Sequence, residues 1–212
     1  MHIEPGILSS AKIAFANVAA IGMLGAYAPG LVKRPTLLLR TALAAVFFSV
    51  FMQVFHMPVG ASELHFVGAM PIYLLLGFVP TLFGFALGLL LQGLLFDPQD
   101  LAHLAVNSLS LMVPLAAVHY GLGKRIAGQF TVANIVKLDF AFYAGVTLMV
   151  GFWLSMGTEP TPLANWAAFA ASYLALVLVE PLVTLAIVRA ARGFKDASWA
   201  QLCLDERVTA AA

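Results

Sequence analysis

Apolar runs that are long enough to cross a lipid bilayer dominate this chain. A membrane-spanning helix needs about 20 consecutive apolar residues, and runs of that length lie at 10–32, 35–57, 102–122, 133–156 and 163–188. Of the 212 residues, 62% are hydrophobic and only 10% are charged, which leaves too little polar surface for a water-soluble globule. The sequence therefore predicts an all-α fold, a polytopic integral membrane helical bundle.

A further apolar stretch, residues 66–96, is too long for one span and short for two. Gly77 and Pro80 interrupt it, which favours two short helices at 66–78 and 81–96. The first of these is expected to cross incompletely or to pack steeply. This interpretation gives seven transmembrane helices, and six helices with a re-entrant third segment is the alternative.

The distribution of charge indicates how these helices are oriented. With seven helices and the N-terminus outside, ten of the eleven Lys and Arg residues fall in or beside predicted cytoplasmic segments, and only Lys12 lies outside. Acidic residues such as Glu63 and Glu159 fall on the opposite side. This bias follows the positive-inside rule. We therefore expect the N-terminus outside and the C-terminus inside, with the loop at 58–65 on the outer face.

The chain is expected to form a single membrane domain that keeps its N-terminus. Residues 1–10 contain no Lys or Arg, so they lack the basic start of a secretory signal peptide. Removal of the initiator methionine requires a small second residue, and His2 is large, so Met1 is expected to stay. The domain (1–212) would comprise an extracytoplasmic N-terminal segment (1–9), a helical bundle (10–193) and a polar cytoplasmic tail (194–212), which is either an interfacial helix or a disordered end.

His2 directly follows a free amino terminus, and the two together can bind one metal ion through three nitrogens. The donors are the Met1 amine, the deprotonated amide nitrogen of His2 and the His2 imidazole. They lie in one plane, which suits the square-planar or tetragonal preference of Ni(II), Cu(II) and low-spin Co(II). We hypothesise that the rest of the chain holds this segment and supplies a fourth ligand. The alternative is that Met-His is simply how the chain starts.

The predicted topology brings four of the five histidines toward the outer side: His2, His56, His65 and His103. Histidines solvated by lipid headgroups are the alternative to a metal site. His103, Asn107 and Ser110 are spaced i, i+4, i+7 and share one helix face. Polar side chains inside a membrane usually point into the bundle, so this face is expected to hydrogen-bond the ligand imidazoles, or else to join two helices.

Three further residues of the predicted helices have either a coupling or a structural role. Glu180 lies deep in the last span, where a carboxylate is a functional candidate, although it can also be paired structurally. Ala16 and Ala20 would let another helix approach the first span closely. The chain has no GxxxxGK[ST] phosphate loop, no HExxH motif and no spacing that suggests a Ser/His/Asp triad. We therefore expect no enzyme activity and no ATP hydrolysis by this chain alone.

Short segments along almost the whole chain resemble, in order, the CbiM/NikM family, the substrate-binding components of cobalt and nickel energy-coupling-factor (ECF) transporters. These segments are Met1-His2-Ile3, Gly60–Gly68, Leu75-Leu76-Gly77, Gln92–Phe96 with Asn107 after it, and Val179–Thr184. The resemblance implies an ATP-driven uptake system in a bacterial or archaeal cytoplasmic membrane. Its partners would be a membrane coupling (T) subunit, two ABC ATPases and, in some members, a small auxiliary membrane subunit, with no nucleic acid.

The resemblance also implies a square-planar site for Ni(II) or Co(II) in which His65 is the fourth ligand beside Met1 and His2. Ser62, Glu63, His103 and Asn107 would surround these ligands. The chain departs from the family at Glu63, which lengthens the loop by one residue, at His103, which replaces a small residue, and at Ser110 and Pro181. These departures leave the metal open, with Cu(II) less favoured. The alternatives are a membrane metal sensor or assembly protein that does not transport, and a structural membrane subunit.

Overall fold

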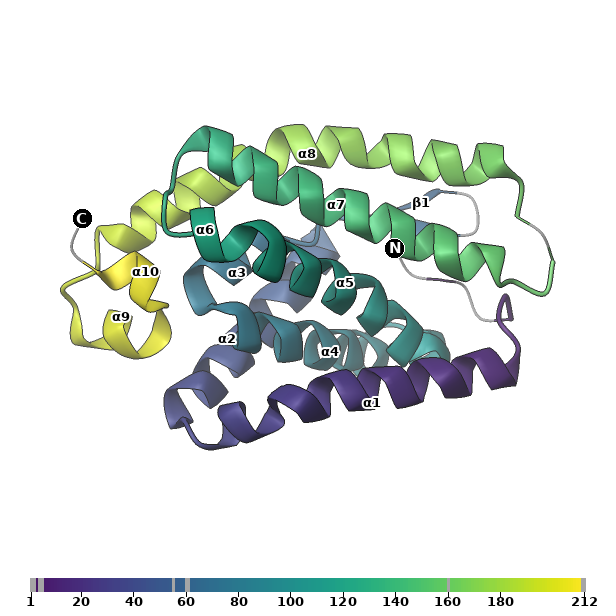
Figure 1. The fold of residues 1–212 in the computed structure, drawn as a ribbon, viewed down its shortest axis with the longest axis horizontal. Helices are drawn as coiled ribbons and strands as arrows, with labels where there is room; N and C mark the ends of the chain where they lie inside the picture. The colour runs from purple at the N-terminus through teal and green to yellow at the C-terminus, as the bar shows by residue number, and fades with distance from the viewer. Residues whose placement is uncertain (1–2, 4–5, 55, 60–61, 160, 211–212) are drawn as a thin grey trace.

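The computed structural model describes residues 3, 6–54, 56–59, 62–159 and 161–210, and the chain is almost entirely helical (Figure 1). Six helical segments are long and apolar enough to span a membrane: α1 (Ser10–Val32), α2 (Pro35–Val54), α4 (Phe78–Leu95), Pro98–Ile126 with α5 (Leu104–Val118) at its centre, α7 (Val132–Ser155) and α8 (Leu163–Arg192). The shorter elements are β1 (His56–Val59), β2 (Ser62–His65), α3 (Ala69–Leu76), the 3-10 helix η1 (Pro98–His103), the π-helix η2 (His119–Gly123), α6 (Lys124–Ile126), α9 (Ser198–Cys203) and α10 (Glu206–Thr209). The prediction of a polytopic helical membrane protein is confirmed.

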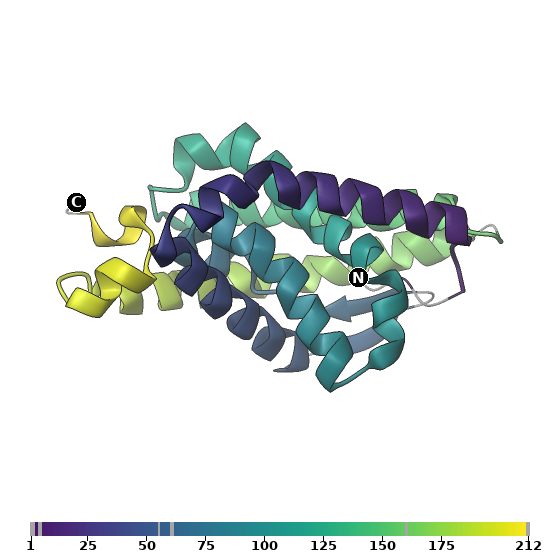
Figure 2. The ribbon, with the colours of Figure 1, turned by 90° about the horizontal axis from the view of Figure 1, so that it is seen from below.

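The long helices lie side by side along the long axis of the molecule, which gives the bundle two distinct ends (Figures 1 and 2). At one end the Thr158 N–H, in the loop between α7 and α8, donates to the Ile7 carbonyl at 2.9 Å. This bond places the start of α1 beside the start of α8, and we call this the N-terminal end. The helices α9 and α10 pack at the opposite, tail end (Figure 1).

The stretch 66–96 forms two helices with a break at Gly77, close to the predicted division. The first, α3, has eight residues and is therefore about 12 Å long, less than half the ~30 Å of a bilayer core. It is too short to cross, so the described residues contain six helices of spanning length rather than seven. The break is sharp because Gly77 has a φ of 93°, in a region that other residues rarely adopt.

Residues 56–59 and 62–65 form two paired strands where the sequence predicted a loop at 58–65, and α2 ends at Val54 instead of continuing to 57. We call this strand pair the hairpin. The strands β1 and β2 pair antiparallel, with His56 opposite His65. Leu64 lines an apolar cavity of about 800 Å³ together with Ala175 of α8. Since Ala175 lies about 18 Å along α8 from its start, the hairpin reaches into the depth of the bundle. Strand pairing satisfies the facing N–H and carbonyl groups of the two strands, and a membrane interior tolerates their outer edges only where other protein segments cover them.

The segment after α8 folds back onto the bundle and contains α9 and α10, so of the two alternatives for the tail, a disordered end does not apply to its described part. Asp205 N–H donates to the Leu75 carbonyl at 2.6 Å, and Arg207 Nη2 donates to the Tyr73 carbonyl at 3.0 Å. These carbonyls belong to the last turn of α3, where a helix leaves acceptor capacity unused, and the Tyr73 carbonyl also accepts from the Gly77 N–H at 3.1 Å. The tail therefore completes the C-terminal end of α3.

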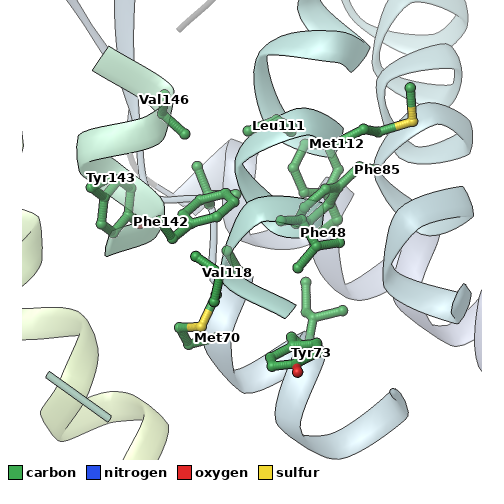
Figure 3. Packing of buried hydrophobic residues seen from close by; sticks show 14 of the residues in the cluster. Phe48, Met70, Tyr73, Phe85, Leu111, Met112, Val118, Phe142, Tyr143 and Val146 are labelled. Carbon is green, nitrogen blue, oxygen red and sulfur yellow. The ribbon is translucent and has the colours of Figure 1, made fainter. Parts of the chain in front are cut away.

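The core of the bundle lies between α2, α4, α5 and α7 and is rich in aromatic side chains (Figure 3). Phe85 packs 5.2 Å from Phe48 and 6.1 Å from Phe142, measured between ring centroids. Helices α2 and α4 approach closely at Gly84, where an added Cβ would lie 2.4 Å from the Cβ of Ala44. Small residues permit such contacts between membrane helices.

Candidate metal-binding site

The backbone of Ile3 is held from both sides by two side chains at the start of α5. Its N–H donates to Asn107 Oδ1 at 2.9 Å, and its carbonyl lies 2.9 Å from His103 Nδ1. A carbonyl oxygen only accepts, so Nδ1 of His103 carries the hydrogen and donates it. Ile3 is 0% exposed and both partners are 1% exposed. We call this arrangement the Ile3 clamp.

The clamp is possible because His103 and Asn107 are four residues apart where η1 continues into α5. Residues at this spacing lie one above the other on a helix, so their polar atoms can reach the two successive polar groups of one backbone residue. Ser110, the third member of the predicted face, behaves differently. Its hydroxyl donates to the carbonyl of Val106 at 3.0 Å within its own helix, as serine commonly does when buried in a helix.

The residues that connect Ile3 with α1 are fixed by the loop between α7 and α8. The Ile7 carbonyl accepts from Thr158 N–H, and Lys12 Nζ donates to the Met156 carbonyl. Leu8 is buried in the same hydrophobic core as Ile3. Of the described residues here, Ile3 is therefore bonded to α5, and Ile7 and Lys12 are bonded to the α7–α8 loop.

His65 ends β2 and is 5% exposed. Its ring stacks against that of His56, with centroids 6.0 Å apart and planes 24° apart. His56 itself is exposed. The neighbours Leu64 and Val67 belong to the same hydrophobic core as Ile3. The structure thus places His65 in a segment whose neighbours are buried in the core of the bundle.

Several predicted site residues lie outside what the structure describes. Met1 and His2 belong to this group, and for Ser62 and Glu63 only the backbone is described, as part of β2 opposite Val59 and Pro58. Among the described residues, no three His, Cys, Asp or Glu side chains come together as a metal site. A chelate that uses an amine and an amide nitrogen needs only two imidazoles, so it is compatible with this arrangement.

The residues considered for coupling or structure are all buried. Ala16 and Ala20 are 0% and 6% exposed, and Ala20 lies beside Ala105 and Ser108 of α5. Glu180 is 0% exposed, and its carboxyl accepts hydrogen bonds from other helices. The close approach expected at the two alanines therefore includes contact with this chain's own helices.

Sequence reasoning missed two residues of α7, Asp139 and Tyr143. Tyr143 donates its hydroxyl to Glu180, and Asp139 is 0% exposed one turn earlier on the same helix. The available signal was Asp139 itself, an acid inside an apolar run, which is costly in a membrane. Because Asp139 lies only two residues after Lys137, the sequence there resembles the charged end of a helix.

Comparison with known proteins assigns the chain to a family. The search of curated proteins and the search of solved structures gave no match. The family model described as CbiM, cobalt uptake substrate-specific transmembrane region, matches residues 2–197. This match covers the described N-terminal segment, the hairpin and all six helices of spanning length. The chain therefore belongs to the CbiM family of cobalt uptake substrate-specific transmembrane proteins.

Proposed function

We propose that this chain is the metal-binding component of an ATP-driven ECF transporter that takes up Ni(II) or Co(II). The metal, which is the cargo, is bound by the Met1 amine, the amide nitrogen and imidazole of His2, and the imidazole of His65. Membership of a cobalt uptake family supports the cargo. Four nitrogens in one plane suit Ni(II) and low-spin Co(II), and Cu(II) is less favoured.

The observation that carries this proposal is the Ile3 clamp. Ile3 directly follows His2, and its N–H and carbonyl are both bonded to α5. A clamp on one residue restricts its neighbour because consecutive Cα atoms are only about 3.8 Å apart. The proposed ligands include two backbone nitrogens, the Met1 amine and the His2 amide. Hydrogen bonds to the backbone of the next residue, Ile3, therefore help to position them more directly than a contact with the Ile3 side chain would. Preorganised ligands bind a metal more tightly because less ordering remains to be done on binding.

The chain forms a single domain in the bacterial or archaeal cytoplasmic membrane, with the N-terminal end outside and the tail end inside. Metal is captured at the N-terminal end and released inward after the N-terminal segment moves away from His65. This step needs energy, and the sequence has no phosphate-binding loop. The energy comes from two ABC ATPases through a membrane coupling subunit, and a small auxiliary membrane subunit completes the complex where one is required.

Uptake of radiolabelled nickel or cobalt by intact cells tests the transport function. Cells that produce this chain together with the coupling subunit and the ATPases are expected to accumulate the label, and cells that lack only this chain are not. The matched control replaces the chain by its His65→Ala variant. Equal accumulation with and without the chain would contradict transport and favour a sensor or assembly role.

The Ile3 clamp predicts a second result. Asn107→Leu removes the acceptor of the Ile3 N–H while keeping a side chain of similar size, and it leaves that N–H buried without a partner. We expect nickel affinity to fall about 10- to 100-fold, the usual effect of removing a group that orients a ligand. Calorimetric titration of the purified protein measures it.

Ser110→Ala is the matched control for Asn107→Leu. Ser110 is 0% exposed on the same helix, and its hydroxyl donates to the Val106 carbonyl of its own helix. Its removal is expected to leave nickel affinity unchanged. If both substitutions weaken binding equally, the effect comes from α5 packing and not from the clamp.

A further inference from the structure

Glu180 lies near the middle of α8, yet its carboxyl is bonded to two other helices. Its Oε1 accepts a hydrogen bond from the Met70 N–H at 3.2 Å, from a residue 110 positions away in the sequence. Its Oε2 accepts from the Tyr143 hydroxyl of α7. Glu180 and Met70 are 0% exposed and Tyr143 is 1% exposed. One buried carboxyl group therefore joins α3, α7 and α8.

The first turn of α3 needs an acceptor from elsewhere in the chain. A helix leaves its first N–H groups without an intrahelical partner, and the N-cap side chain usually accepts from one of them. The N-cap of α3 is Gly68, which has no side chain. Pro71 has no N–H, and the Ile72 N–H reaches the Gly68 carbonyl at 3.2 Å. This leaves Ala69 and Met70, and Glu180 accepts from Met70.

No local side chain can replace this cap. Gly68 has a φ of 61°, a conformation that strains residues with a Cβ. A Cβ at this position would lie 2.2 Å from Cδ2 of Phe51, so the ring occupies the space that a capping side chain needs. Bulk water does not reach this turn either, because Ala69 and Met70 are 0% exposed. The cap must therefore come from another helix, and α8 provides it.

The capped turn is directly connected to His65. Strand β2 ends at His65 and α3 begins at Ala69, so only three residues separate them. This connection is held by packing: Val67 is 0% exposed, and the Phe66 ring meets Phe51 edge-on with centroids 5.6 Å apart. A shift of the first residues of α3 would be transmitted through this short, packed connection to the end of β2, because close-packed interiors have low compressibility and transmit strain.

We propose that Glu180 is a positioning residue for metal capture: by capping α3 it fixes the place from which the His65 imidazole reaches the metal. Glu180 does not touch the metal and acts only through the backbone of α3. The inference rests on the proposed function, because it assumes that His65 is a ligand. By this route a residue in the middle of α8 acts on a site at the N-terminal end.

Two substitutions at Glu180 separate the cap from the presence of an acid. Glu180→Asp keeps the acid but withdraws it from Met70 by one methylene, whereas Glu180→Gln keeps an oxygen acceptor at full reach. Each full-length protein is purified in detergent and titrated with Ni(II), and affinity and the visible absorption spectrum are recorded. We expect Glu180→Asp to bind about 10-fold more weakly, with absorption at longer wavelength, as when water replaces a nitrogen ligand. Glu180→Gln is expected to keep wild-type affinity and spectrum.

Two further variants complete the test, one as a control and one as a second disturbance of the cap. Thr184→Ala alters another side chain that is 0% exposed one turn further along α8, and it is expected to behave as wild type. Tyr143→Phe keeps the ring packing but removes the hydroxyl that orients the carboxyl, and it is expected to give the same spectral shift to a smaller extent. Thermal unfolding of the metal-free proteins checks that each variant is folded, and if Glu180→Asp is not, Tyr143→Phe decides.

Wild-type affinity and spectrum in both Glu180→Asp and Tyr143→Phe would overturn the inference. Weak binding by Glu180→Gln together with normal binding by Glu180→Asp would also overturn it, because the acid and not the cap would then matter. His65→Ala is measured alongside. If it too binds as wild type, the proposed function has failed; if it loses affinity while the Glu180 and Tyr143 variants do not, only the positioning role has failed.

Discussion

A Gly-Ser-Gly-Ser extension before Met1 is expected to abolish high-affinity nickel binding. The extension converts the Met1 amine into an amide and ends the chelate that the amine and the His2 nitrogens form together. The binding free energy of a four-ligand metal site in a small protein is about 10–16 kcal/mol, or roughly 3 kcal/mol for each donor. Every ~1.4 kcal/mol of binding free energy corresponds to a tenfold change in affinity. Loss of one donor or more therefore predicts at least about a 100-fold fall in affinity. Equilibrium dialysis followed by elemental analysis measures it.

The length of this extension matters. A single added residue would make His2 the third residue of the chain, where the amine, two amides and the imidazole form another planar set of four nitrogens. Four added residues avoid that set. The same four residues placed after Ala212 are the control and should leave binding intact. Full nickel stoichiometry in the extended protein would show that the amino terminus is not a ligand.

His65→Ala is expected to lower nickel affinity about 100-fold by the same estimate for each donor. The three nitrogens of Met1 and His2 remain, so weak binding persists, and water replaces the imidazole. The absorption band should move to longer wavelength because water is a weaker-field ligand than imidazole. Titration followed by visible spectroscopy detects both effects.

His56→Ala is the matched control for this substitution. His56 faces His65 across the hairpin, and their rings stack at 6.0 Å, so the two variants disturb the same strand pair. His56 is exposed and is not one of the proposed ligands. We expect its removal to have little effect on affinity. The assignment of the fourth ligand is wrong if His56→Ala loses binding and His65→Ala does not.

The spans could be predicted because apolar length alone decides what a bilayer accepts. The first run was expected at 10–32, and α1 is Ser10–Val32. The end of α2 could not be predicted in the same way, since Met57 and Val59 are apolar and fit a helix as well as a strand. In the fold both strands contact α8, more than 100 residues later in the sequence, and such a distant partner leaves no local pattern.

The side chains around the candidate site were predictable in part. The spacing of His103 and Asn107 placed both on one helix face, and they do lie together. Their partner was not predictable, because it is the backbone of Ile3 and any residue has the same N–H and carbonyl. The cap that Glu180 provides for α3 was not predictable for a similar reason. A hydrogen bond between a carboxyl and the N–H of a residue far away in the sequence leaves no pattern in a single sequence.

The depth of the β1–β2 hairpin sets an order for the insertion of the chain during its synthesis. The hairpin is complete at His65, whereas α8, which contacts both strands, begins only at Leu163. Strand backbone at membrane depth is tolerated only where protein covers it, so the hairpin has to remain near the membrane surface until α8 has entered. Likewise, the Ile3 N–H can form its hydrogen bond to Asn107 only after α5 has been synthesised. Segments early in this sequence thus reach their final positions only after much later segments are in place.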